Sequence, residues 1–112
     1  MNWRAQGFRA WLLQRLTAVY ILAFLVIFLI LLAANNPVGY AAWRNMMGNA
    51  MTAVFTAIFF LAVIFHGWVG IRDVLIDYVH NVALRFSALV LVALALLVMA
   101  LWMLRTLLVV AL

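Results

Sequence analysis

Three long stretches of this 112-residue chain contain no Asp, Glu, Lys or Arg: residues 16–43, 45–71 and 86–104. Each can supply the roughly 20 predominantly apolar residues that a helix needs to cross a bilayer. Across the chain 73% of residues are hydrophobic and 8% are charged, whereas soluble domains are about half apolar and a quarter charged. The sequence therefore predicts an all-α membrane protein with three transmembrane helices, and it leaves no room for a soluble catalytic domain.

The three predicted helices, at about residues 12–34, 46–72 and 84–110, make up a single membrane domain over residues 1–112. The segment 35–39, Asn-Asn-Pro-Val-Gly, favours a turn after the first helix. A cleaved signal peptide also places basic residues before an apolar run, but that run is only about 7–15 residues long and a small-x-small cleavage site follows it. Neither condition holds here, so we interpret the first segment as a retained helix.

The charged residues predict how the helices are oriented. Seven arginines and two aspartates give a net charge of +5, and Lys and Glu do not occur. Three arginines precede the first helix, and Arg72 and Arg85 flank the second connection, whereas the first connection has only Arg44. By the positive-inside rule the N-terminus faces the cytoplasm, or its mitochondrial equivalent, and the C-terminus faces the opposite, periplasmic side. Topology and contact with anionic lipid explain these charges without any binding of nucleic acid.

The absence of cysteine limits which cofactors the chain can hold. Without a thiol the chain can neither ligate an iron–sulfur cluster nor attach a haem covalently. Any redox cofactor must therefore be held by other side chains. Three helices of this size are too few to enclose a cofactor, so we expect helices from a partner chain to pack against them.

Both histidines and both aspartates of the chain fall within the segment 65–80, F-H-G-W-V-G-I-R-D-V-L-I-D-Y-V-H. A histidine inside a membrane helix is costly unless it is paired, so His66 is a candidate functional residue. If the helix continues through the segment, at about 3.6 residues per turn, four residues lie within about 40° of one line: His66, Gly70, Asp73 and Asp77. They form one polar stripe that runs toward the cytoplasmic surface.

Two interpretations of His66 remain open from the residues alone. Haem iron is commonly held by a helical histidine, and Gly67 and Gly70 would let a flat macrocycle approach the backbone. Alternatively, His66 forms a hydrogen bond between helices and the glycines aid packing. His80 is about 21 Å away along a straight helix, so a second axial ligand would come from another chain. We interpret His80, in a polar loop, as a surface histidine.

The end of the polar stripe offers groups suited to a quinone. The phenolic O–H of Tyr78 can donate a hydrogen bond to a quinone carbonyl, and Asp77 can orient an arginine or take part in proton delivery. Arg15, at the same level on the first helix, can bind a haem propionate or a carboxylate. Tyrosine is also ordinary at a membrane interface, and Arg15 can be a simple topology charge.

The pattern H-x-x-x-G-x-x-x-x-x-x-D-Y, formed by His66, Gly70, Asp77 and Tyr78, resembles the second-helix signature of the succinate dehydrogenase hydrophobic membrane anchor family. The segment R-L-T-A-V-Y at 15–20 is similar to the start of the family's first helix. Chain length, the number of helices and their orientation also agree with the family. The combination is specific, although each residue alone is not.

The resemblance implies a subunit of complex II in a bacterial inner membrane, or in the mitochondrial inner membrane of a eukaryote. The chain would pack against a homologous three-helix anchor, the cytochrome b556 subunit, and share one b-type haem with it. His66 would be an axial ligand of the iron. Tyr78 would donate a hydrogen bond to ubiquinone, supported by Asp77 and Arg15. A flavoprotein subunit would oxidise succinate and an iron–sulfur subunit would pass the electrons on, so this chain would carry no succinate chemistry itself.

The family pattern is not matched everywhere. Some members carry a His-Asp pair ahead of the first helix where this chain has Arg9 and Ala10. Other functions considered are a fumarate reductase-type anchor, a membrane scaffold without a cofactor, and a small proton-coupled exporter. The exporter would be expected to have four helices and an intramembrane carboxylate, and neither is predicted here.

Overall fold

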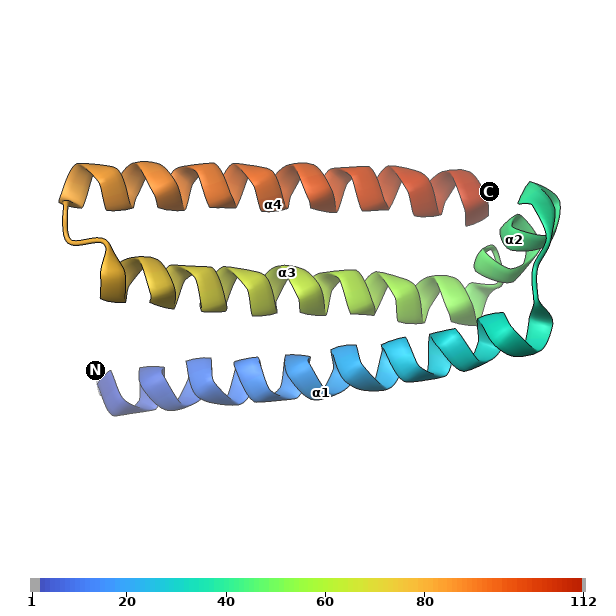
Figure 1. Cartoon of the computed structure of the whole chain (residues 1–112), viewed down its shortest axis with the longest axis horizontal. Coiled ribbons are helices and arrows are strands. Elements are labelled where there is room, and N and C mark those ends of the chain that lie inside the picture. Colours follow the sequence, from blue (N-terminus) through green and yellow to red (C-terminus); the bar gives the residue numbers. More distant parts are fainter. Residues whose placement is uncertain (1–2, 112) are drawn as a thin grey trace.

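The computed structural model describes the backbone of residues 3–111 and the side chains of residues 7–110. It contains four helices in this part of the chain: α1 (Trp3–Asn35), α2 (Gly39–Met47), α3 (Ala50–Tyr78) and α4 (Val82–Ala111). Figure 1 shows α1, α3 and α4 side by side, with α3 in the middle and α2 at the end where α1 leads into α3. Three helices are long and apolar enough to cross a membrane. The predicted all-α membrane fold with three spanning helices is therefore confirmed.

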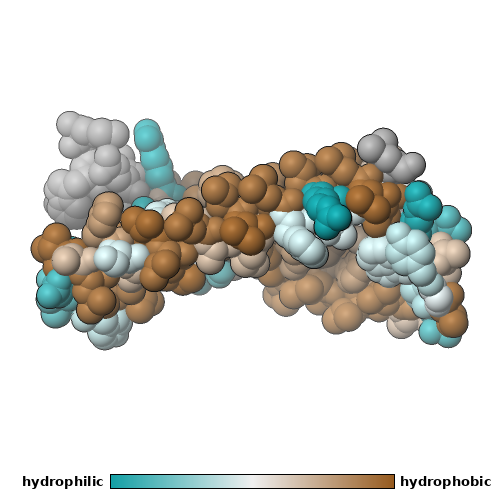
Figure 2. All heavy atoms as spheres, turned by 90° about the horizontal axis from the view of Figure 1, so that it is seen from above, coloured by the Kyte–Doolittle hydropathy of each residue, from teal (hydrophilic) through white to brown (hydrophobic). Residues whose placement is uncertain are grey.

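The three long helices form a layer rather than a closed bundle. Helix α3 packs against both α1 and α4, whereas in the described part of the chain no Cα atom of α1 lies within 8 Å of one of α4. The molecule extends over 50 × 25 × 23 Å, and its long axis matches a bilayer of about 40–45 Å including headgroups. Figure 2 shows hydrophobic residues covering most of the visible face between more hydrophilic ends. This surface is suited to contact with lipid or with the helices of another chain.

Packing between α1 and α3 depends on aromatic side chains and on two polar contacts. The rings of Phe24 and Phe59 stack with their centroids 4.4 Å apart. The Tyr20 hydroxyl donates a hydrogen bond of 2.8 Å to the Phe55 carbonyl oxygen on α3. The second polar contact joins Thr17 to His66 and is described below. Because an unpaired polar group is costly in hydrocarbon, such contacts fix which faces of two apolar helices meet.

The connection between α1 and α3 contains a helix that the sequence did not predict. Helix α1 ends at Asn35, just before Asn36 and Pro37. Asn36 takes φ 42° and Gly39 takes φ 85°. Proline disfavours helical geometry in the residue before it, which explains why α1 stops here. The residues from 39 to 47 then form α2, whose Met47 is buried. The second spanning helix therefore begins at Ala50, capped by Asn49, rather than near residue 46.

The connection between α3 and α4 is short and well bonded. Helix α3 continues beyond its predicted end near residue 72 as far as Tyr78. The Asn81 side chain accepts a hydrogen bond of 3.1 Å from the Leu84 amide and so caps the start of α4. Arg85 Nε donates a hydrogen bond of 3.0 Å to the Val79 carbonyl oxygen at the end of α3. These bonds fix the position of Tyr78 relative to α4.

Gly48 is required where α2 meets the end of α4. A Cβ atom on this residue would lie 2.9 Å from the Val110 carbonyl oxygen and 2.8 Å from that of Arg44. We expect Gly48→Ala to destabilise the folded protein by about 1–3 kcal/mol, the usual cost of overpacking. Unfolding in mixed detergent micelles would measure the change. Gly7→Ala is the matched control, because a Cβ there meets nothing within 4 Å. Equal stability of the two variants would contradict the prediction.

Candidate functional site

His66 lies in the interface between α3 and α1 and is partly buried. Its Nδ1 atom is 3.2 Å from the Thr17 Oγ1 atom on α1. The other ring nitrogen, Nε2, has no hydrogen-bond partner among residues 7–110. The two ring nitrogens therefore differ: one is bonded within the chain and the other is available to a group from outside it.

Thr17 joins His66 to the backbone of α1. Its Oγ1 atom lies 2.8 Å from the Leu13 carbonyl oxygen and 3.1 Å from the Gln14 carbonyl oxygen. Thr17 is only 8% exposed, so water does not compete for these contacts. Thr17 lies in the segment 15–20 that resembles the start of the family's first helix. Its contact with His66 could not be predicted, because the two residues are 49 positions apart.

The two glycines near His66 have different surroundings. A Cβ on Gly70 would lie 3.4 Å from Gln14 Nε2 on α1, whereas a Cβ on Gly67 would meet nothing within 4 Å. Gly70 therefore faces α1, and Gly67 leaves open space beside His66. The Gln14 Oε1 atom is buried and has no hydrogen-bond partner among the residues that the structure describes. Gln14, like Thr17, was missed in the sequence, since only the packing of α1 on α3 shows that it faces inward.

His66 lies near the middle of α3, whereas Asp77 and Tyr78 lie at its C-terminal end. Figure 1 shows that α1 begins at this end of the molecule. Tyr78 is the last residue of α3 and is 77% exposed. Asp77 is exposed beside it. The Arg15 guanidinium lies over the Trp11 ring, 5.7 Å from its centroid, which is cation–π geometry. Within residues 7–110 no hydrogen bond or ion pair joins Arg15 to Asp77, so their shared role stays a prediction.

The remaining titratable residues of this segment are at the surface. Asp73 forms an exposed ion pair with Arg72 at 3.2 Å, and exposed pairs of this kind contribute little to stability. His80 is exposed in the connection after α3, as expected of a surface histidine. In the part of the chain that the structure describes, no three His, Cys, Asp or Glu residues are grouped as metal ligands.

Residues 1–101 match the sequence model of the succinate dehydrogenase/fumarate reductase transmembrane subunit family. The chain belongs to this family. It is also 29% identical, over 97 residues, to the succinate dehydrogenase hydrophobic membrane anchor subunit of Coxiella burnetii (strain RSA 493 / Nine Mile phase I). That similarity covers 87% of this chain and 84% of its relative. The family resemblance inferred from His66, Gly70, Asp77 and Tyr78 is therefore confirmed.

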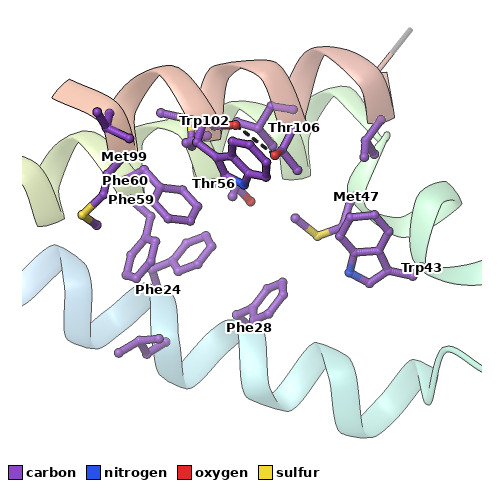
Figure 3. A pocket seen from close by; sticks show the side chains of 15 residues that line it. Phe24, Phe28, Trp43, Met47, Thr56, Phe59, Phe60, Met99, Trp102 and Thr106 are labelled. Atoms are coloured by element: carbon purple, nitrogen blue, oxygen red, sulfur yellow. Dashed lines mark hydrogen bonds between the residues drawn. The ribbon is translucent and has the colours of Figure 1, made fainter. Parts of the chain in front are cut away.

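This member of the family also has an apolar pocket at the opposite end, near α2. The pocket has a volume of about 610 Å³ and lies between side chains of all four helices. Figure 3 shows Phe24 of α1 and Phe59 of α3 on one side, and Trp43 and Met47 of α2 on the other. Thr56 also lines the pocket and is 4% exposed, and within residues 7–110 its hydroxyl has no hydrogen-bond partner. The sequence did not predict this pocket, because α2 forms one of its walls.

Proposed function

We propose that residues 1–112 form one anchor domain of a succinate:quinone oxidoreductase, complex II, in the inner membrane. The chain would pair with a second three-helix anchor, the cytochrome b556 subunit, and bind the iron–sulfur and flavoprotein subunits at its cytoplasmic side. Family membership over residues 1–101 supports the anchor function. Packing against a second anchor is supported by the layer of helices, which leaves broad apolar faces on both sides of α3.

The residues around His66 fit a haem b shared between the two anchors. One observation carries this proposal: Nδ1 is within hydrogen-bond distance of Thr17, while Nε2 has no partner among residues 7–110. Ligand histidines usually show this arrangement, because the nitrogen that is not bound to metal bonds to a neighbouring group. The open space at Gly67 leaves room for a flat group next to the ring. His66 would be one axial ligand, and a residue of the partner chain would be the other.

When bound, haem b would act as a one-electron carrier within the membrane. The residues of this chain would hold it and keep water away from it. His66 lies within an apolar helix. Its neighbours Phe65 and Ile71 are exposed on the surface of this chain, where they could pack against a partner helix or the haem. An apolar environment and the hydrogen bonding of the ligand histidine are two of the means by which a protein tunes the potential of such a carrier.

We further propose that Tyr78 binds ubiquinone at the cytoplasmic end of α3. Its hydroxyl is exposed at a helix end, where a quinone in the membrane can reach it. A phenolic O–H can donate a hydrogen bond to a quinone carbonyl. This bond becomes stronger when negative charge develops on the carbonyl oxygen during reduction. Asp77 would support proton delivery to the reduced quinone, and Arg15 would balance negative charge at the same end.

Purification of the complex through a tag on this chain tests the proposal. We expect flavin and iron–sulfur subunits to copurify, and a dithionite-reduced minus oxidised spectrum to show a b-type α-band. Succinate should reduce flavin in the same sample, and the rates with succinate and fumarate would distinguish a succinate dehydrogenase from a fumarate reductase. Copurifying flavin without haem would reject His66 as a ligand. Absence of both flavin and haem would overturn the anchor function.

A further inference from the structure

We propose that Thr17 is the positioning residue of His66: its hydroxyl oxygen accepts a hydrogen bond from Nδ1–H and so leaves Nε2 unprotonated toward the haem iron. This inference rests on the proposed haem function. It concerns a residue of α1 that touches the ligand side chain and not the iron. The Thr17 hydroxyl has a single hydrogen to donate, so the atom that accepts it decides the direction of the bond with His66.

The distances indicate that this hydrogen is donated to the backbone of α1. Oγ1 has three polar neighbours: the Leu13 carbonyl oxygen at 2.8 Å, the Gln14 carbonyl oxygen at 3.1 Å, and His66 Nδ1 at 3.2 Å. A hydroxyl has one hydrogen to donate, and two of these neighbours can only accept. In helices, threonine commonly donates to the carbonyl four residues earlier, and about 2.8 Å is the preferred O–H···O distance.

Once the hydroxyl hydrogen is used, the contact with His66 requires the ring to donate. The lone pairs of Oγ1 can accept from Nδ1–H, and 3.2 Å is within the usual range for an N–H···O bond. A neutral imidazole carries one N–H, so a proton on Nδ1 leaves Nε2 with a lone pair. The tautomer of a ligand histidine is set in this way by the bond of its other nitrogen.

Burial strengthens the effect of the Thr17–His66 hydrogen bond on the binding of iron. Thr17 is 8% exposed and lies between two membrane helices, where water does not replace a missing acceptor. Without the hydroxyl, Nδ1–H would be left unpaired, and the ring would gain by rotating or by moving its proton to Nε2. Either change weakens the bond from Nε2 to iron. Loss of such supporting bonds typically lowers metal affinity by about 10- to 100-fold.

The hydrogen bond between Thr17 and His66 is also expected to lower the midpoint potential of the haem. A hydrogen bond from Nδ1–H to an oxygen acceptor raises the basicity of the imidazole. A more basic axial ligand stabilises ferric iron relative to ferrous iron, because it donates more electron density. Removal of the Thr17 hydroxyl is therefore expected to raise the midpoint potential of any haem that remains bound.

The test compares Thr17→Val, which keeps the shape but loses the hydroxyl, with Thr17→Ser, which keeps the hydroxyl. Both are made in the full complex. The measurements are the ratio of haem to flavin, the midpoint potential of the haem, and binding of carbon monoxide to the reduced haem. We expect Thr17→Val to have a lower haem content or, where haem is retained, a higher potential and new carbon monoxide binding. Thr17→Ser should resemble the unmodified complex.

Thr106→Val is the matched control. The Thr106 hydroxyl also donates to the carbonyl oxygen four residues earlier, that of Trp102 at 2.9 Å, but Thr106 lies on α4 and has no hydrogen bond to His66 among the described residues. This substitution should leave all three measurements unchanged. If Thr17→Val fails to assemble, Thr17→Ala replaces it, and equal carbon monoxide binding in the Ala and Ser variants would overturn the inference.

Unchanged haem content, potential and carbon monoxide binding in Thr17→Val would also overturn it. The proposed function fails by a different result, namely no haem in the unmodified complex, so the two failures are distinguishable.

Discussion

Replacing His66 with alanine is expected to abolish the b-type bands of the purified complex while flavin and the other subunits still copurify. His66 is the only histidine within the spanning helices, since His80 lies in the connection after α3. No group of three possible metal ligands exists in the described part of the chain to replace it. Loss of one axial ligand removes both the bond and the geometry that hold the iron. We therefore expect at least a tenfold fall in haem per flavin.

The same replacement should leave the helices assembled. The Thr17 hydroxyl keeps its bond to the Leu13 carbonyl oxygen when the His66 ring is gone, so the variant leaves no buried donor unpaired on α1. Two other contacts hold α1 against α3: the stacked pair Phe24 and Phe59, and the bond of Tyr20 to Phe55. On α3 their members, Phe59 and Phe55, precede His66 by seven and eleven residues. Circular dichroism and recovery of the complex would verify this.

His80→Ala is the control for a general effect of removing histidine. His80 is exposed and makes no described contact with α1, so haem content should not change. The haem is measured as its pyridine complex and the flavin by acid extraction. A His66→Ala complex with full haem content would reject this residue as a ligand and return His66 to a packing role between α1 and α3.

Tyr78→Phe is expected to lower quinone reduction about 10- to 100-fold while oxidation of succinate by a soluble artificial acceptor stays normal. The substitution removes one hydroxyl and nothing else. A hydrogen bond to a group that becomes charged contributes about 1.5–3 kcal/mol, and each 1.4 kcal/mol is about a factor of ten in rate. Because Tyr78 is 77% exposed, the loss of its hydroxyl has no folding cost in this chain.

Tyr40→Phe is the control for the Tyr78 experiment. Tyr40 is also exposed, at 62%, but it lies on α2 at the other end of the molecule. Rates with a short-chain ubiquinone and with the soluble acceptor are measured on the same preparations. Normal quinone turnover in Tyr78→Phe would rule out an essential phenolic hydrogen bond, and an equal loss in both assays would place the defect before the quinone.

The candidate site was only partly predictable from the sequence. His66 could be identified because a histidine within an apolar segment requires a partner, and the spacing to Gly70 and Tyr78 carried the family resemblance. Thr17 and Gln14 could not be identified, because small polar residues in a membrane helix are common. Which of them faces another helix depends on the rotation of α1 about its axis. Similarly, the sequence suggested that both Gly67 and Gly70 allow close approach to the backbone, but only Gly70 faces α1.

The sequence by itself determined the three spanning helices, because long charge-free segments have only one stable arrangement in lipid, in which every backbone group is bonded within its own helix. It did not determine α2, since nine residues between two turn signals read equally well as a loop. Tertiary structure alone decided that Met47 closes a pocket and that Thr17 meets His66. Both depend on side-chain contacts between segments far apart in the chain, and hydrophobicity along one helix does not specify them.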